Sequence, residues 1–146
     1  MISGPLPPPL AGIKVLDLSA VYSGPMAAAL LADQGADVIK VESPGGDICR
    51  RIGPANGDIS GTFVAMNRGK RSIALDLKSA DGKAVLRDLI ARTDVLMENF
   101  RPGVLAKLGF DRDALSQINP RLIYLSITGF RPSVTKVMAK KEMGCS

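Results

Sequence analysis

The chain has 146 residues, of which 46% are hydrophobic and 23% charged, with 19 Lys and Arg against 14 Asp and Glu for a formal net charge of +5. This composition predicts a folded globular domain rather than a disordered tail or a disulfide-stapled scaffold. The sequence contains no histidine. That absence excludes a Ser-His-Asp triad, a His-ligated zinc ion and a His general base within this polypeptide.

The positive charge is concentrated near the end of the chain. Residues 131–146 carry a net +3, whereas residues 1–130 hold 15 basic against 13 acidic residues. A basic face for nucleic acid is therefore not expected, and the aromatic content of 4% argues against stacking on bases.

The cysteines and the N-terminal sequence indicate the cellular setting. Cys49 and Cys145 form no metal-binding or redox pair, so we expect reduced thiols, no metal and a cytoplasmic protein, or a mitochondrial or peroxisomal one in a eukaryote. The first ten residues lack the features of a signal peptide, and no apolar run reaches the ~18 residues of a membrane span. No membrane partner is expected.

Predicted strands and helices alternate along the chain. Residues 1–11 are rich in proline and predict an extended arm. Strands are predicted at 13–18, 37–41, 71–77, 95–99 and 122–127, helices at 26–34, 81–92, 102–108 and 111–118, and a long surface loop at 42–61. The pattern predicts an α/β fold over residues 12–130, with an open, mostly parallel Rossmann-like sheet of about five strands and flanking helices. Residues 131–146 form a separate basic tail in this division.

Ligands bind such sheets at the carboxyl ends of the strands. A dinucleotide site would use Glu42 as its ribose acid, but residues 19–25 contain one glycine instead of G-x-G-x-x-G, and Pro25 lacks the N–H that a pyrophosphate needs. Otherwise Glu42 is expected to be a solvated acid at a strand end.

Three further segments suit an anion. Arg50 and Arg51 follow the second strand, and guanidinium groups bind phosphates or carboxylates in a bidentate manner. The alternative is that they are solvated or pair with Asp47. Residues 67–72 form a similar basic turn, and residues 98–105 enter a helix through Pro-Gly with a side-chain amide at the turn. The residues alone thus predict an α/β domain with an anion-binding rim.

Together these segments resemble the family III CoA-transferases, which include formyl-CoA, carnitine-CoA and succinyl-CoA transferases and the related acyl-CoA racemases. Two of the motifs are Leu75-Asp76-Leu77-Lys78 and Glu98-Asn99-Phe100-Arg101-Pro102-Gly103. The other matching segments are 7–18, 24–25, 31–42, 67–73, 94–97, 108–109, 119–124 and 126–130. The matches follow one another in the order found in the family.

The resemblance implies that this α/β part recognises coenzyme A. The loop of Val21, Tyr22 and Ser23 lies where the family borders the thioester. The residues that match the positions holding adenine, ribose and phosphates are Ser43, Leu75, Lys78, Asn99, Phe100, Arg101, Lys107 and Leu108. Some relatives carry at the position of Ser43 an arginine that stacks on adenine, so the adenine pocket is expected to be weaker or built differently here.

The resemblance also implies a reaction in which CoA moves between an acyl-CoA and a small carboxylic acid. In the family an aspartate carboxylate attacks the thioester, and CoA returns to form an enzyme thioester. That aspartate lies beyond the position of Phe130, whereas the last aspartate here is Asp113. No catalytic residue is therefore assigned, and the histidine of the racemases is absent.

Two expectations follow from the missing aspartate. The first is a family III transferase truncated before its nucleophile, with the interlocked homodimer of the family. The alternative is a catalytically inactive fragment that binds CoA or mediates dimerisation.

Overall fold

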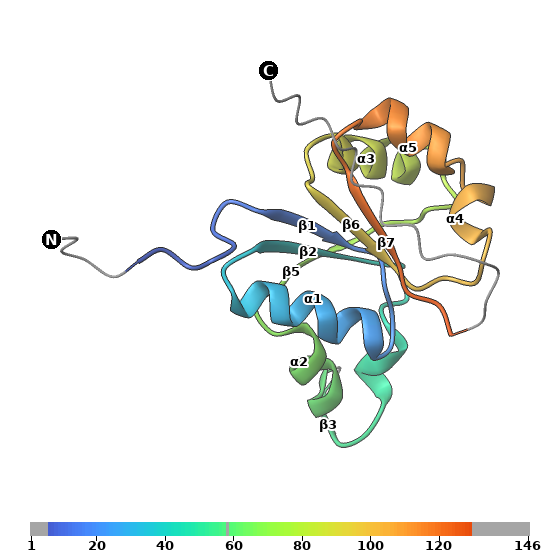
Figure 1. Ribbon diagram of the computed structural model, residues 1–146. Helices are drawn as coiled ribbons and strands as arrows, with labels where there is room; N and C mark the ends of the chain where they lie inside the picture. The colour runs from blue at the N-terminus through green and yellow to red at the C-terminus, as the bar shows by residue number, and fades with distance from the viewer. Residues whose placement is uncertain (1–5, 58, 130–146) are drawn as a thin grey trace, which may run out of the picture.

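The computed structural model describes residues 6–57 and 59–129 and is dominated by one parallel sheet (Figure 1). Residues 1–5 of the predicted arm and the whole basic segment 131–146 lie outside the described residues. The strands of this sheet are β1 (Lys14–Asp17), β2 (Asp37–Glu42), β5 (Arg71–Ala74), β6 (Val95–Glu98) and β7 (Ile123–Ser126). Their order is β5-β2-β1-β6-β7, and every neighbouring pair is parallel. The predicted α/β class with a five-stranded parallel sheet is confirmed.

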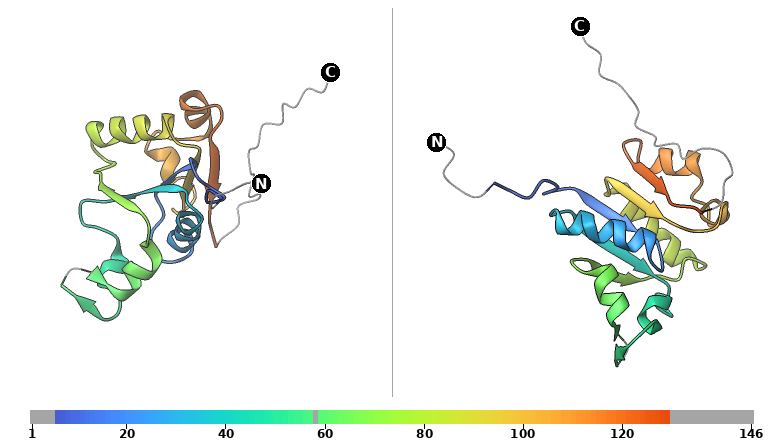
Figure 2. Two further views of the ribbon diagram at one scale, coloured as in Figure 1. Left: turned by 90° about the vertical axis from the view of Figure 1, so that its left-hand side faces the viewer. Right: turned by 60° about the horizontal axis from the view of Figure 1, so that its bottom comes forward.

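Helices cover both faces of the sheet (Figure 2). On one face lie α1 (Ser23–Asp33) and the shorter α2 (Gly61–Asn67). On the other lie α3 (Ala80–Ala91) and α5 (Arg112–Ile118), and α4 (Val104–Lys107) lies near the carboxyl ends of the strands. Ser60, Ser79 and Asp111 cap α2, α3 and α5 by accepting a backbone N–H in the first turn.

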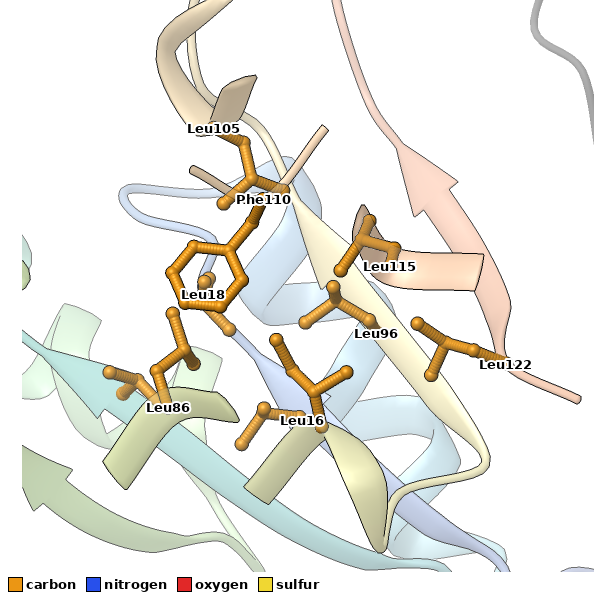
Figure 3. Packing of buried hydrophobic residues seen from close by; sticks show 10 residues of the cluster. Leu16, Leu18, Leu86, Leu96, Leu105, Phe110, Leu115 and Leu122 are labelled. Carbon is orange, nitrogen blue, oxygen red and sulfur yellow. The ribbon is translucent and has the colours of Figure 1, made fainter. Parts of the chain in front are cut away.

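Strand alternation divides the core into two clusters. Leu16 and Leu96 point toward α3, where they join Leu86 and Phe110 in the larger cluster 1 (Figure 3). Their neighbours along the strands, among them Val15, point the other way and pack under α1 in cluster 2. Each fully buried leucine of cluster 1 contributes about 2 kcal/mol of transfer free energy to folding. Because cluster 2 lies on the opposite face, buried apolar side chains stabilise the sheet on both faces.

Two boundaries near α1 differ from the predicted ones. The helix begins at Ser23, three residues earlier than predicted, because Gly24 lets the chain approach Ser19 closely: a Cβ at Gly24 would lie 2.2 Å from Ser19 Cβ. The described part of the arm is docked rather than only extended. Leu10 N donates to Gln34 O (3.0 Å), and a Cβ at Gly35 would lie 2.4 Å from Pro8 Cβ.

The predicted long loop at 42–61 is the clearest error. It contains the 3₁₀ helix η1 (Ile48–Arg51) and a small hairpin of β3 (Ala55–Asn56) and β4 (Ile59–Ser60). It is followed by α2, which the sequence did not predict. The helix has seven residues, none of them buried, and its half-buried side of Phe63 and Met66 is too short to form a repeating apolar pattern.

Candidate functional site

The carboxyl ends of the strands form the candidate site. From β1 the chain moves to β2 and β5 on one side of the sheet, then returns to β6 and β7 on the other. The strand order therefore reverses between β1 and β6, which is where open α/β sheets bind ligands. The loops after these two strands, residues 18–22 and 99–103, lie at this point.

Buried charges lie beneath the site on the face of the sheet that carries α1. Along β1 and β2 this face changes from Val15 and Val38 near the start to Asp17, Lys40 and Glu42 near the end. Each of these charges has an ion-pair partner, in the pairs Lys70–Asp17 (2.7 Å), Lys40–Asp47 (2.9 Å) and Arg50–Glu42 (2.7 Å). Burial of unpaired charges would be strongly unfavourable, so these pairs fix the loops that supply the partners.

Glu42 is the best-connected of these acids. It accepts hydrogen bonds from Arg50 Nε (2.8 Å), Arg50 Nη2 (2.7 Å), Ser72 Oγ (2.6 Å) and Asp47 N (2.9 Å). Burial by itself would raise the pKa of Glu42, but these bonds and the Arg50 charge lower it to about 2. The expectation of a solvated acid at the strand end is wrong, because Glu42 is buried and both of its carboxylate oxygens accept hydrogen bonds within the fold.

The basic segments are also used within the fold. Arg50 pairs with Glu42 instead of Asp47 and lies over the Phe63 ring, 3.8 Å from its centroid. Arg51 is exposed and donates to Gly45 O (3.2 Å). In the turn 67–72, the ion pairs are Arg68–Asp33, Lys70–Asp17 and Arg71–Asp37. The three cations of that turn therefore pair with aspartates of α1, β1 and β2 instead of being presented to an anion.

Asn99, a predicted CoA contact, joins the two loops at the switch point. Its Oδ1 accepts from Ala20 N (2.8 Å) and its Nδ2 donates to Ala20 O (2.7 Å). The preceding residue, Glu98, is buried and accepts from Phe100 N (2.6 Å) and Tyr124 Oη (2.7 Å). Burial and then this bond to Glu98 raise the pKa of Tyr124. The loop after β6 is thus fixed by the bonds of Asn99 to the loop after β1 and by the bonds of Glu98 to Phe100 and Tyr124.

The remaining predicted residues form an apolar group and a cationic group. Leu75, Phe100 and Leu108 are half-buried and all pack against cluster 1. The cationic rim, which we define as Lys78, Arg101 and Lys107, is exposed, and none of the three forms an ion pair with another described residue. At the start of α1, Val21 is half-buried, whereas Tyr22 and Ser23 are exposed.

Ser43 lines a cleft of about 660 Å³. The cleft is also lined by Gly45, Gly46, Arg51 and Ser72. Within the described part of the chain its lining includes none of the other predicted CoA residues. Ser43 Oγ donates to Gly46 O (3.3 Å), which closes the turn after β2.

The sequence reasoning missed the buried charges Asp17, Lys40 and Lys70. A detectable signal existed for the first two, because a charged residue inside a short apolar strand is expected to have a buried partner. The described ranges contain no group of three or more His, Cys, Asp or Glu suited to a metal ion. They also contain no helix long and apolar enough to cross a membrane.

Comparison with known proteins identifies the family. The sequence model of CoA-transferase family III matches residues 10–138. The chain belongs to CoA-transferase family III. The match ends inside the segment 131–146, so the domain boundary at residue 130 stays a prediction.

Family III relatives with curated names are similar over most of this chain. A succinate–glutarate CoA-transferase of Agrobacterium fabrum is 52% identical over 131 residues, which cover 84% of this chain and 33% of the relative. A formyl-CoA:oxalate CoA-transferase of Streptomyces coelicolor is 49% identical and covers 83% of this chain and 30% of the relative. The chain thus spans about a third of the length of these family III relatives.

Solved structures agree with the family assignment. A CAIB/BAIF family protein from Brucella suis superposes with a TM-score of 0.81 at 47% identity, over 86% of this chain and 34% of that one. A protein from Mycobacterium tuberculosis gives a TM-score of 0.78 at 40% identity, over 86% and 37%. The parallel sheet described above is therefore the fold of the corresponding part of these proteins.

Proposed function

We propose that this chain supplies the CoA-binding part of a transferase that moves CoA between an acyl-CoA and a small carboxylic acid. The observation that carries the proposal is the arrangement of the apolar and cationic groups. Leu75, Phe100 and Leu108 pack on one core cluster at the carboxyl end of the sheet, close in sequence to the exposed cations Lys78, Arg101 and Lys107. An adenine ring needs apolar faces, and the CoA phosphates need cations.

The acid substrate is a short dicarboxylate in this proposal. Relatives with 49–52% identity are named for succinate and glutarate, for succinyl-CoA and L-malate, and for acetyl-CoA and oxalate. These names share a compact acid with a second carboxylate. An acid of this kind needs a cation for the carboxylate that does not react.

The transfer itself requires a nucleophilic carboxylate. An aspartate attacks the acyl-CoA carbonyl to form a mixed anhydride and release CoA thiolate, and the thiolate then attacks the aspartyl carbonyl to release the first acid. The acceptor carboxylate reverses these steps and leaves as its CoA thioester. The last aspartate of this sequence is Asp113 in the first turn of α5. A polypeptide of these 146 residues is therefore expected to bind CoA without transferring it.

Calorimetric titration of the 146-residue chain with CoA tests the binding step. Saturable binding is expected, with an affinity that falls as the salt concentration rises because phosphates are bound by exposed cations. A parallel assay incubates the chain with succinyl-CoA and oxalate and separates the CoA esters by chromatography. Absence of saturable binding contradicts the proposed function, and formation of oxalyl-CoA contradicts the assignment of the nucleophile to a residue outside this chain.

We also propose a homodimer as the assembled form. Edge strand β7 supports it: Ile123 is 44% exposed, and Leu125 and Ile127 on the same side of the strand are half-buried. Apolar side chains at an edge of the sheet formed by residues 6–57 and 59–129 favour pairing with another polypeptide. Light scattering after size-exclusion chromatography is expected to give the dimer mass, and a strictly monomeric mass at high concentration contradicts the proposal.

A further inference from the structure

The turn at residues 19–21, between β1 and α1, has an unusual set of hydrogen bonds. All six of its backbone N–H and C=O groups bond to side chains. The bonds are Ser19 N to Asp17 Oδ1 (2.9 Å), Lys40 Nζ to Ser19 O (2.8 Å), Ala20 N to Asn99 Oδ1 (2.8 Å), Asn99 Nδ2 to Ala20 O (2.7 Å), Val21 N to Asp47 Oδ1 (3.4 Å) and Cys49 Sγ to Val21 O (3.0 Å). We call this set the side-chain clamp. Turn backbones more commonly bond to other backbone groups or to water.

Val21 is held in a conformation that its own side chain disfavours. Its φ of +71° lies in the left-handed region, and among the described residues Val21 is the one residue other than glycine with a positive φ. A β-branched residue in this region costs on the order of 1–3 kcal/mol and persists only when its surroundings hold it there. The backbone groups of Val21 bond to Asp47 and Cys49, which both lie near the start of η1.

Asp47 and Cys49 are themselves fixed. The Asp47–Lys40 ion pair is 2.9 Å long, with both side chains 2% exposed. Asp47 Oδ1 also accepts from Cys49 N (2.9 Å), and Cys49 is fully buried. Burial, and then the charge of Asp47, raise the pKa of the Cys49 thiol, so its S–H remains available as a donor to Val21 O. The strained residue is thus supported by buried, paired groups at the start of η1, which Lys40 ties to β2.

We infer that Asp47 and Cys49 are positioning residues for the acyl-CoA thioester, because they hold Val21 in the left-handed conformation and thereby fix where Tyr22 and Ser23 meet the substrate. The inference rests on the proposed function together with the family resemblance, which implies that the loop of Val21, Tyr22 and Ser23 borders the thioester. Neither residue touches the substrate. They act through the turn at residues 19–21, whose backbone N–H and C=O groups all bond to side chains of this chain. The substrate would therefore contact the exposed side chains of Tyr22 and Ser23.

The inference predicts a selective loss of affinity. In this inference the thioester end of the substrate depends on the clamp. The predicted nucleotide contacts are Ser43 and residues after β5, after β6 and around α4, and none of them takes part in the clamp except Asn99. Removal of the Cys49 donor should therefore weaken binding of an acyl-CoA more than binding of adenosine 3′,5′-bisphosphate, which carries the nucleotide end alone. A residue with a merely structural role would affect both ligands together.

The test titrates the wild-type chain, Cys49→Ala and Cys49→Ser with acetyl-CoA and with adenosine 3′,5′-bisphosphate, and records a thermal melt of each variant. Cys49→Ala is expected to weaken acetyl-CoA binding about fivefold to tenfold, the value of one buried hydrogen bond, and to leave the bisphosphate within about twofold. Cys49→Ser keeps a donor at the same place and is expected to restore most of the acetyl-CoA affinity.

A second variant separates positioning from folding. Glycine adopts a positive φ without strain, so in a Val21→Gly background the further change Cys49→Ala should cost acetyl-CoA binding less than about twofold. An equal cost in both backgrounds overturns the inference, as does unchanged acetyl-CoA affinity in Cys49→Ala or an equal loss for both ligands. The inference is also overturned if the wild-type chain binds acetyl-CoA no more tightly than adenosine 3′,5′-bisphosphate. That result would leave the proposed binding of the nucleotide end standing. A wild-type chain that binds neither ligand removes the proposed function as well.

Discussion

The side-chain clamp and the cationic rim lie at the same end of the sheet but are built in opposite ways. The clamp consists of buried, mutually paired groups, including Lys40 and Asp47 at 2% exposure each. The rim consists of exposed side chains without an ion pair among the described residues. A reacting carbonyl needs a fixed position, because small displacements cost much of the rate. Phosphates attract cations over several ångströms, so flexible lysines and arginines suffice for them.

The largest effect is expected where the buried pairs are broken. Lys70 Nζ pairs with Asp17 Oδ2 (2.7 Å) and donates to Pro25 O (2.8 Å) at the start of α1. Lys70→Met leaves the Asp17 carboxylate buried without its cation and is expected to lower the free energy of unfolding by about 3–5 kcal/mol. Chemical denaturation measures this loss.

Arg71→Ala is the matched control for Lys70→Met. It removes the neighbouring cation, whose pair with Asp37 is 66% and 47% exposed. Exposed pairs contribute about 0–1 kcal/mol, so this variant should stay close to the wild type. Equal destabilisation by the two variants would contradict the distinction between buried and exposed charges.

The second effect concerns pH. The pKa of Glu42 is about 2 in the folded chain against 4.5 for the free group, so the folded state favours the carboxylate. The resulting stability is fully present above pH 4.5 and is lost as the pH falls toward 2, by about 3 kcal/mol in total. The difference in unfolding free energy between wild type and Glu42→Gln should therefore shrink across this range. Parallel pH curves for the two proteins would contradict the pairing of Glu42 with Arg50.

Much of the fold could be predicted, because core periodicity is visible in the sequence. Leu86 and Ile90 repeat at helical spacing, and the predicted helix at 81–92 corresponds to α3 within one residue at each end. The helix α2 could not be found in this way, since none of its residues is buried. The Ser60 cap is a local signal that the prediction did not use, whereas the packing of α2 beside α1 is not a local property of its sequence.

The site was only partly predictable, for a different reason. The type of a residue indicates which hydrogen bonds or ion pairs it can form, but not which residue elsewhere in the fold becomes its partner. A glutamate at a strand end is expected to be solvated, but Arg50, eight residues away, and Ser72, thirty residues away, bind the carboxylate oxygens of Glu42. Val21 gave no signal at all, because a β-branched residue predicts an extended backbone and its left-handed conformation is imposed by distant side chains.

The third prediction concerns the cationic rim. Lys78→Ala and Arg101→Ala are each expected to weaken CoA binding about threefold to tenfold in low salt, with a smaller loss in 0.5 M salt, because the contacts are exposed charge pairs. Thermal stability should not change. Lys14→Ala removes another exposed lysine, at the start of β1 and thus at the other end of the sheet, and serves as the control. A loss of affinity that is equal for Lys14 and Lys78 would show a general effect of net charge and not a phosphate site.

The smallest effect is expected at the cleft after β2, where the family resemblance implies that some relatives carry an arginine in place of Ser43. Ser43 is exposed and lines the cleft together with Arg51. Ser43→Arg would place a planar guanidinium where the resemblance implies a stacking contact with adenine. An exposed stacking contact of this kind is worth about 0.5–1 kcal/mol, or about twofold to fivefold in CoA affinity. Ser43→Lys adds the same charge without the planar group and should gain less. Titrations with CoA and with pantetheine, which lacks the adenine, locate the gain: it should appear for CoA alone. An equal gain in CoA affinity from arginine and from lysine would show that the added charge, not stacking, causes the gain. Residue 43 would then act on CoA as the cationic rim is expected to act.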